Sequence, residues 1–190
     1  MELRYWSLLI FLGAIWGSAF MFIKIATPEL GPVFLVQLRL ALASLVFLPL
    51  LIRPKLLKLF IRSFKYILIL SLTNTAIPFI LFSEASNGSD SNMLAILNSS
   101  TALMTMFIAF FWLKEKITIK QIGGLILGFI GIVILVNPKN SSIDAYSAFI
   151  CLAGSFCYAF SGVFIQKYCV SINKLVLIGW SLVFGTILLI

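Results

Sequence analysis

One ionised side chain, Arg39, lies inside a long apolar stretch, LVQLRLALASLVFLPL at residues 35–50. A guanidinium stays charged at physiological pH and binds carboxylates and phosphates through two parallel hydrogen bonds. Three roles are open for it: anchoring an anionic group of a bound molecule, pairing with Glu84 or with loop carbonyls, or extending outward toward water.

Polar side chains interrupt the other apolar stretches as well. Those that fall at a similar level or slightly deeper are Trp16, Ser18, Asn74, Asn98, Thr101 and Tyr158. Hydroxyl groups in helices often bond carbonyls of their own helix, and Asn side chains can join two helices. Because these residues come from several helices, we expect them to share one wet cavity.

Other kinds of chemistry are poorly supported by the composition. The chain has no histidine, which argues against haem, most metal sites and hydrolases with a Ser–His or Cys–His pair. The cysteines Cys151, Cys157 and Cys169 form no CxxC motif, so neither zinc nor a disulfide framework is indicated. We expect a protein without cofactor, metal or catalytic residues, and therefore not an enzyme.

The elements that carry these residues are membrane helices. The chain has 190 residues, of which 62% are hydrophobic and 11% charged, against about 45–50% and about 25% in soluble domains. This composition predicts an all-α integral membrane protein, a multi-pass helix bundle surrounded by lipid. About seven segments are expected, at Tyr5–Ala26, Val33–Ile52, Tyr66–Phe82, Asn92–Leu113, Ile122–Val136, Ala145–Tyr168 and Leu175–Ile190.

The basic residues predict the orientation. The net charge of +8 comes largely from clusters at 53–65 and 114–120, which lie between apolar runs and so indicate topology rather than nucleic-acid binding. With the N-terminus in the cytoplasm, eleven of the fourteen basic residues lie inside, Lys24 and Lys139 lie outside, and Arg39 lies in the membrane.

Four stretches resemble the EamA-type branch of the drug/metabolite transporter superfamily: GAIWGSAFMFIK (13–24), LRLALA (38–43), AILNSSTALMTMFIAFFWLKEKIT (95–118) and QIGGLILGFIGIVIL (121–135). The resemblance implies a five-helix repeat at residues 5–136, followed by the start of an inverted second repeat at 145–190. Family members typically have ten helices, so a C-terminally truncated permease is expected. They often carry proline where this chain has Ala102, which puts a kink there in doubt.

The resemblance also implies a function. Such permeases move small polar metabolites, such as amino acids or nucleotide-type metabolites, across the inner (plasma) membrane by alternating access. The expected substrate-binding residues are the polar set above together with Arg39. No acidic residue lies within a predicted span, so exchange, or coupling through residues elsewhere, is expected.

Four further expectations concern gates, packing and alternatives. Lys24 either reaches the headgroups or acts as a gate, and Glu84 is a further gate candidate. Glu115, a characteristic family glutamate, is expected to form a salt-bridge latch with the lysines around it. Gly124, Gly128 and Gly131 share one helix face and predict close packing, within the bundle or between subunits.

The alternatives are a multidrug efflux protein, a membrane enzyme, or a truncated half that pairs as a homodimer or with a missing C-terminal half.

Overall fold

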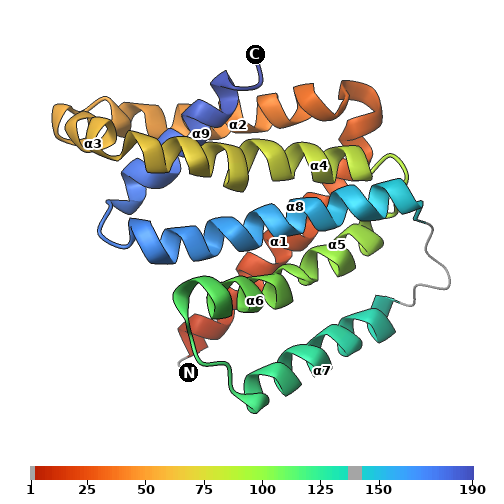
Figure 1. The fold of residues 1–190 in the computed structure, drawn as a ribbon. Helices are drawn as coiled ribbons and strands as arrows, with labels where there is room; N and C mark the ends of the chain where they lie inside the picture. The colour runs from red at the N-terminus through yellow and green to blue at the C-terminus, as the bar shows by residue number, and fades with distance from the viewer. Residues whose placement is uncertain (1–2, 137–142) are drawn as a thin grey trace.

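The computed structural model describes residues 3–136 and 143–190, and every regular element in these ranges is a helix (Figure 1). The elements are α1 (Leu3–Leu30), α2 (Pro32–Leu51), α3 (Pro54–Leu70), η1 (Ser71–Ala76), α4 (Ile77–Ala85), α5 (Ser91–Ser99), α6 (Thr101–Leu113), α7 (Ile119–Val136), α8 (Ala145–Phe164), η3 (Ile165–Cys169) and α9 (Lys174–Ile187). The prediction of an all-α multi-pass membrane protein is confirmed. Lys139, which entered the orientation argument, lies outside the described residues.

Within the described ranges, five helical bodies are long and apolar enough to cross a membrane: Arg4–Leu30, Pro32–Leu51, Pro54–Ala85, Ser91–Leu113 and Ala145–Cys169. Two shorter apolar helices, Ile119–Gly131 and Lys174–Ile187, occupy the fifth and seventh predicted segments. Large apolar side chains are exposed along the spanning helices, such as Phe11 (66%) on α1 and Val46 (74%) on α2. A surface of this kind is stable in contact with lipid rather than water.

The basic segment at 53–65 corrects the sequence interpretation. It was expected to connect two apolar segments, but it forms most of α3, which begins with Pro54 at the first helical position. Its basic side chains are exposed, whereas Ser63 and Ile67 on the opposite side are buried. Together with η1 and α4 it forms one helix of 32 residues, Pro54–Ala85, which is roughly 48 Å long. A hydrocarbon layer of about 30 Å leaves its basic end outside the apolar region.

Two membrane helices are irregular where they carry asparagine. In η1, Ser71 and Thr75 donate their hydroxyls to carbonyls four residues earlier, at 2.8 and 2.5 Å. Pro78 has no N–H for the carbonyl of Asn74, so the regular α-helical pattern cannot continue there.

The second irregularity separates α5 from α6 at Ser100 without any proline, so Ala102 does not prevent a break. Ser99 and Ser100 donate to the carbonyls of Ile96 and Leu97, at 2.6 and 2.5 Å. Hydroxyl bonds of this kind bend helices. Asn98 and Thr101 lie on either side of the break.

The helices of the C-terminal segment pack into the same bundle as those before them. Helix α8 packs chiefly against α4, α6 and α5, and α9 packs against α2 and α3. Figure 1 shows α8 between α4 and the α5–α6 pair, with α7 at the edge of the bundle. Two buried apolar clusters result. One contains Ile67, Phe164 and Val176, and the other contains Phe82 and Cys151.

Candidate functional site

A cavity of about 630 Å³ lies at the centre of the bundle. The polar and aromatic residues in its wall come from α1, η1, α4, α5, α6, α8 and α9: Trp16, Asn74, Thr75, Phe79, Asn98, Ser99, Thr101, Tyr158 and Ser181. A second chamber of about 250 Å³ adjoins it, because Trp16, Phe79, Asn98 and Tyr158 line both. Arg39 of α2 lines this smaller chamber.

The structure brings together six of the seven residues that were expected to bind substrate: Trp16, Arg39, Asn74, Asn98, Thr101 and Tyr158. Ser18 is the exception. It lines neither chamber, and its hydroxyl donates to the carbonyl of Ile15 at 2.9 Å. Two positions along an α-helix correspond to a rotation of about 200°, so Trp16 and Ser18 lie on opposite faces of α1. Ser18 therefore does not line these chambers with the other six residues, and a role for it in binding stays a prediction.

The two asparagines are held through their carbonyl oxygens. Asn74 Oδ1 accepts a hydrogen bond from Ser161 of α8 at 2.9 Å, and Asn98 Oδ1 accepts from Thr101 at 3.3 Å. No described residue accepts a hydrogen bond from either amide nitrogen. Two N–H donor groups are therefore available in the wall of a cavity within the membrane, where water or a ligand must satisfy them.

Arg39 lies beside an aromatic wall. Its guanidinium carbon is 5.0 Å from the ring centroid of Phe79, which is a cation–π arrangement. The Phe79 ring meets that of Tyr158 edge-on at 6.3 Å, and Tyr158 stacks on Phe82 at 5.6 Å. Among the described residues, no carboxylate or carbonyl bonds the guanidinium, so the pairing with Glu84 or with loop carbonyls is not formed. Its charge is available to a ligand in the smaller chamber.

Of the two candidate gate residues, Lys24 joins two helices at the end of the bundle and Glu84 does not, within the described structure. Lys24 of α1 donates to the carbonyl of Ser86, just after α4, at 2.7 Å. The neighbouring hydroxyls of Thr27 and Ser83 lie 3.0 Å apart and connect the same two helices. The Glu84 carboxylate forms no ion pair with a described residue, so the structure shows no latch there.

Glu115 has a partner that was not predicted. Its Oε1 accepts a hydrogen bond from Gln166 of η3 at 2.7 Å, and the lysines around it form no ion pair with it in the described structure. Next to Gln166, Lys167 donates to the carbonyl of Trp112, the penultimate residue of α6, at 3.1 Å. A glutamine near the end of an apolar segment was the only sequence signal for this contact.

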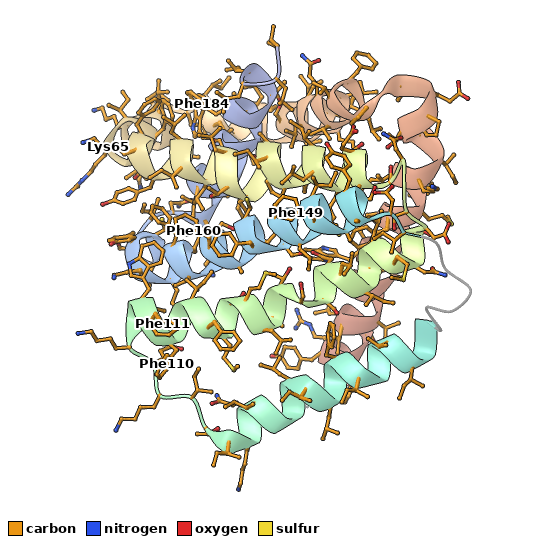
Figure 2. All side chains as sticks on the ribbon, turned by 45° about the vertical axis from the view of Figure 1, so that its right-hand side comes forward. Lys65, Phe110, Phe111, Phe149, Phe160 and Phe184 are labelled. Atoms are coloured by element: carbon orange, nitrogen blue, oxygen red, sulfur yellow. The ribbon has the colours of Figure 1, made fainter. Side chains whose placement is uncertain are left out.

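The glycine face of α7 is not packed in this structure. Within the described part of the chain, no heavy atom outside the local helix lies within 4 Å of a Cβ built on Gly124, Gly128 or Gly131. Gly124 and Gly128 instead line an open groove of about 630 Å³ between α6 and α7. Phe110 and Phe111 lie near the C-terminal end of α6, close to the loop that leads to α7 (Figure 2). Packing of this face against another subunit or segment stays a prediction.

Close helix packing through glycine occurs elsewhere, at positions that sequence reasoning missed. A Cβ on Gly179 of α9 would lie 2.9 Å from Leu51 of α2. A Cβ on Gly185 would lie 2.9 Å from Thr75 Oγ1 and 3.0 Å from Leu40. These glycines are not spaced as GxxxG, which explains why the pattern did not indicate them.

The chain is similar in sequence to known membrane transporters. The sequence model of the EamA-like transporter family matches residues 4–137. An "Uncharacterized transporter" of Archaeoglobus fulgidus is 22% identical over 185 residues, which cover 97% of this chain and 66% of the relative. A "Probable amino-acid metabolite efflux pump" of Salmonella typhimurium is 27% identical over 155 residues, which cover 80% of this chain and 50% of the relative. The matches thus span half to two thirds of these relatives, and no solved structure matches the chain.

Proposed function

The chain belongs to the EamA-like transporter family, and from this premise we propose that it moves a small polar metabolite across the plasma membrane by alternating access. The observation that carries the proposal is the convergence of Arg39, Asn74, Asn98, Thr101 and Tyr158 on two adjoining chambers between membrane helices. In transporters, polar cavities between membrane helices mark the substrate site.

The chemistry of the wall favours a substrate with an anionic group. The Arg39 guanidinium matches the geometry of a carboxylate or phosphate, and it has no anionic partner among the described residues. Asn74 and Asn98 offer N–H donors, and Trp16 offers an apolar surface. An amino acid or a nucleotide-type metabolite meets these requirements. The name of the Salmonella relative, an amino-acid metabolite efflux pump, supports the amino acid.

Multidrug efflux is the alternative within the same superfamily. The aromatic residues of the smaller chamber would suit a lipophilic molecule, but the guanidinium of Arg39 would repel a cation. A second alternative is a half that functions as a homodimer or with further helices. The open groove between α6 and α7 supports that arrangement, since a further helix would cover the exposed face of α7.

The test is substrate counterflow in proteoliposomes that contain the protein, with a panel of amino acids, nucleoside monophosphates and lipophilic cations. We expect one anionic or zwitterionic class to exchange. Arg39→Ala and Asn98→Ala should each lower its exchange about tenfold or more, because each removes a hydrogen-bond donor to a charged group.

Ser18→Ala is the matched control, because Ser18 lies in the same membrane region but outside both chambers. Its exchange rate should stay within about twofold of wild type. Wild-type exchange by both cavity variants would show that the site is elsewhere, and exchange restricted to lipophilic cations would favour drug efflux.

A further inference from the structure

A separate cavity of about 360 Å³ lies where α3, η3 and the start of α9 meet. It shares no lining residue with the central chambers. Its wall consists of Leu59, Arg62, Ser63, Tyr66, Tyr168, Ser171, Ile172 and Asn173. Nothing in the proposed transport mechanism uses this cavity.

The polar groups of this wall are donors. Arg62 supplies a guanidinium, and no described residue pairs with it. Asn173 uses its Oδ1 to cap α9, accepting from the N–H of Leu175 at 2.9 Å, which leaves its amide nitrogen to donate. Tyr66 and Tyr168 add hydroxyl groups, and none of the described residues that line the cavity carries a carboxylate. A set of this composition complements an anion.

The most buried polar group in the wall is the Ser63 hydroxyl. Ser63 is only 8% exposed as a residue, and none of the described residues hydrogen-bonds its side chain. Its hydroxyl group can therefore donate to a ligand that enters the cavity. Its position in the wall means that a ligand entering the cavity would meet this group and satisfy it.

The aromatic side chains around the cavity are of the kind that gathers at the level of the lipid headgroups. The rings of Tyr66 and Tyr168 stack at 6.3 Å, and Trp112 meets Tyr168 edge-on at 6.0 Å. Lys167 lies over the Trp112 ring at 5.1 Å. Tyr and Trp gather at the membrane interface, and basic residues gather on the cytoplasmic side. Arg62 also lies in the basic half of α3, which extends beyond the apolar layer.

We propose that this cavity binds the phosphate group of an anionic phospholipid, with Arg62 as its main anchor. Basic pockets between membrane helices on the cytoplasmic side are suited to such headgroups. The donors around Arg62 would bind the phosphate oxygens, and the Tyr66–Tyr168 stack would face the glycerol and upper acyl region. A soluble phosphate ester has the same chemistry, so the experiment must separate the two sources.

The experiment is native mass spectrometry of the purified protein titrated with phosphatidylglycerol or phosphatidylcholine, together with the variants Arg62→Gln and Lys65→Gln. Lys65 is the matched control: it has the same charge, lies one turn further along α3, is exposed outside the cavity wall, and is seen at the edge of the bundle in Figure 2. We expect the protein to retain phosphatidylglycerol preferentially. Arg62→Gln should weaken that binding roughly fivefold, and Lys65→Gln by less than about twofold.

Three outcomes decide the proposal. Equal losses in the two variants would overturn it, because general surface charge would then explain the binding. Equal affinity of the wild-type protein for both lipids would overturn it as well. Displacement of phosphatidylglycerol by sn-glycerol 3-phosphate, abolished in Arg62→Gln, would support the phosphate site and assign it a soluble ligand. None of these results bears on the central cavity, so the transport proposal is tested separately.

Discussion

Gly88, in the loop between α4 and α5, lies directly against the first turn of α8. Its carbonyl accepts a hydrogen bond from the backbone of Asp144 at 3.1 Å, and Ser89 forms an isolated bridge with Ile143. A Cβ on Gly88 would overlap Asp144 Oδ2 and lie 2.5 Å from Ser147 Oγ. The same Asp144 caps α8: the Ser147 N–H donates to its carboxylate at 2.7 Å, which holds the pKa of that group below its usual value.

We expect Gly88→Ala to lower the free energy of unfolding by about 1–3 kcal/mol, because the new methyl group forces the loop away from the α8 cap. Thermal unfolding in detergent measures this. Gly17→Ala is the control, since no heavy atom of the described residues outside its own helix turn lies within 4 Å of the added Cβ. That control should be neutral or slightly stabilising. An unchanged Gly88→Ala variant would show that the loop does not need this contact.

At the scale of elements, the docking of α9 depends on small residues. Helix α9 lies along α2, where Gly179 meets Leu51 and Gly185 fits against Leu40 and Thr75. Thr75 donates to the carbonyls of Ser71 and Ser181 at 2.5 and 3.5 Å, so η1 and α9 are also joined by a polar contact. Lipid chains are as apolar as the helix surfaces, so burying apolar side chains does little to hold two helices together in a membrane. Close approach of the backbones is therefore what stabilises helix pairs there.

Gly185→Leu should separate α9 from α2 and destabilise the protein by about 1–3 kcal/mol. Gly128→Leu places the same side chain on the open face of α7, where no heavy atom of the described residues lies within 4 Å of the added Cβ, and we expect a change within about 0.5 kcal/mol. Denaturation curves in detergent compare the two. A large loss in Gly128→Leu would show that the glycine face of α7 is packed after all, against another subunit or segment.

For the whole molecule, a single experiment can test which ends of the helices face the cytoplasm. The two core clusters combine buried residues of α3, α4 and α5 with buried residues of α8 and α9, so the last helices belong to the same bundle. The cavity anchored by Arg62 and the contact between Glu115 and Gln166 belong to the ends of the helices predicted to face the cytoplasm. The loop at Asn87 belongs to the opposite ends.

We expect Asn87→Cys to react with a membrane-impermeant maleimide added to intact cells, and Lys116→Cys to react only after permeabilisation. The background would carry alanine at Cys151, Cys157 and Cys169, so that each protein has one thiol. The physical basis is the excess of basic residues on the side predicted to be cytoplasmic. The opposite labelling pattern would reverse the orientation of every helix.

The sequence by itself determined the lipid environment, the number of helical segments and the resemblance to the family. The 62% apolar composition leaves a multi-pass bundle as its stable arrangement. The polar residues within the apolar segments were also predicted to form one group, and those that line the chambers are Trp16, Arg39, Asn74, Asn98, Thr101 and Tyr158. Polar residues in membrane helices avoid lipid, so those on helices that surround a common centre turn toward it.

Only the tertiary structure decided how each helix is rotated about its axis. Helix α1 is apolar on every side, so no contrast between faces indicated that Trp16 lines the two chambers and Ser18 does not. The guanidinium of Arg39 lies over Phe79 rather than beside Glu84, because α2 packs on α4 in that register. The glycines that bring α9 close to α2 were also beyond prediction, since close packing depends on the partner helix as much as on the motif.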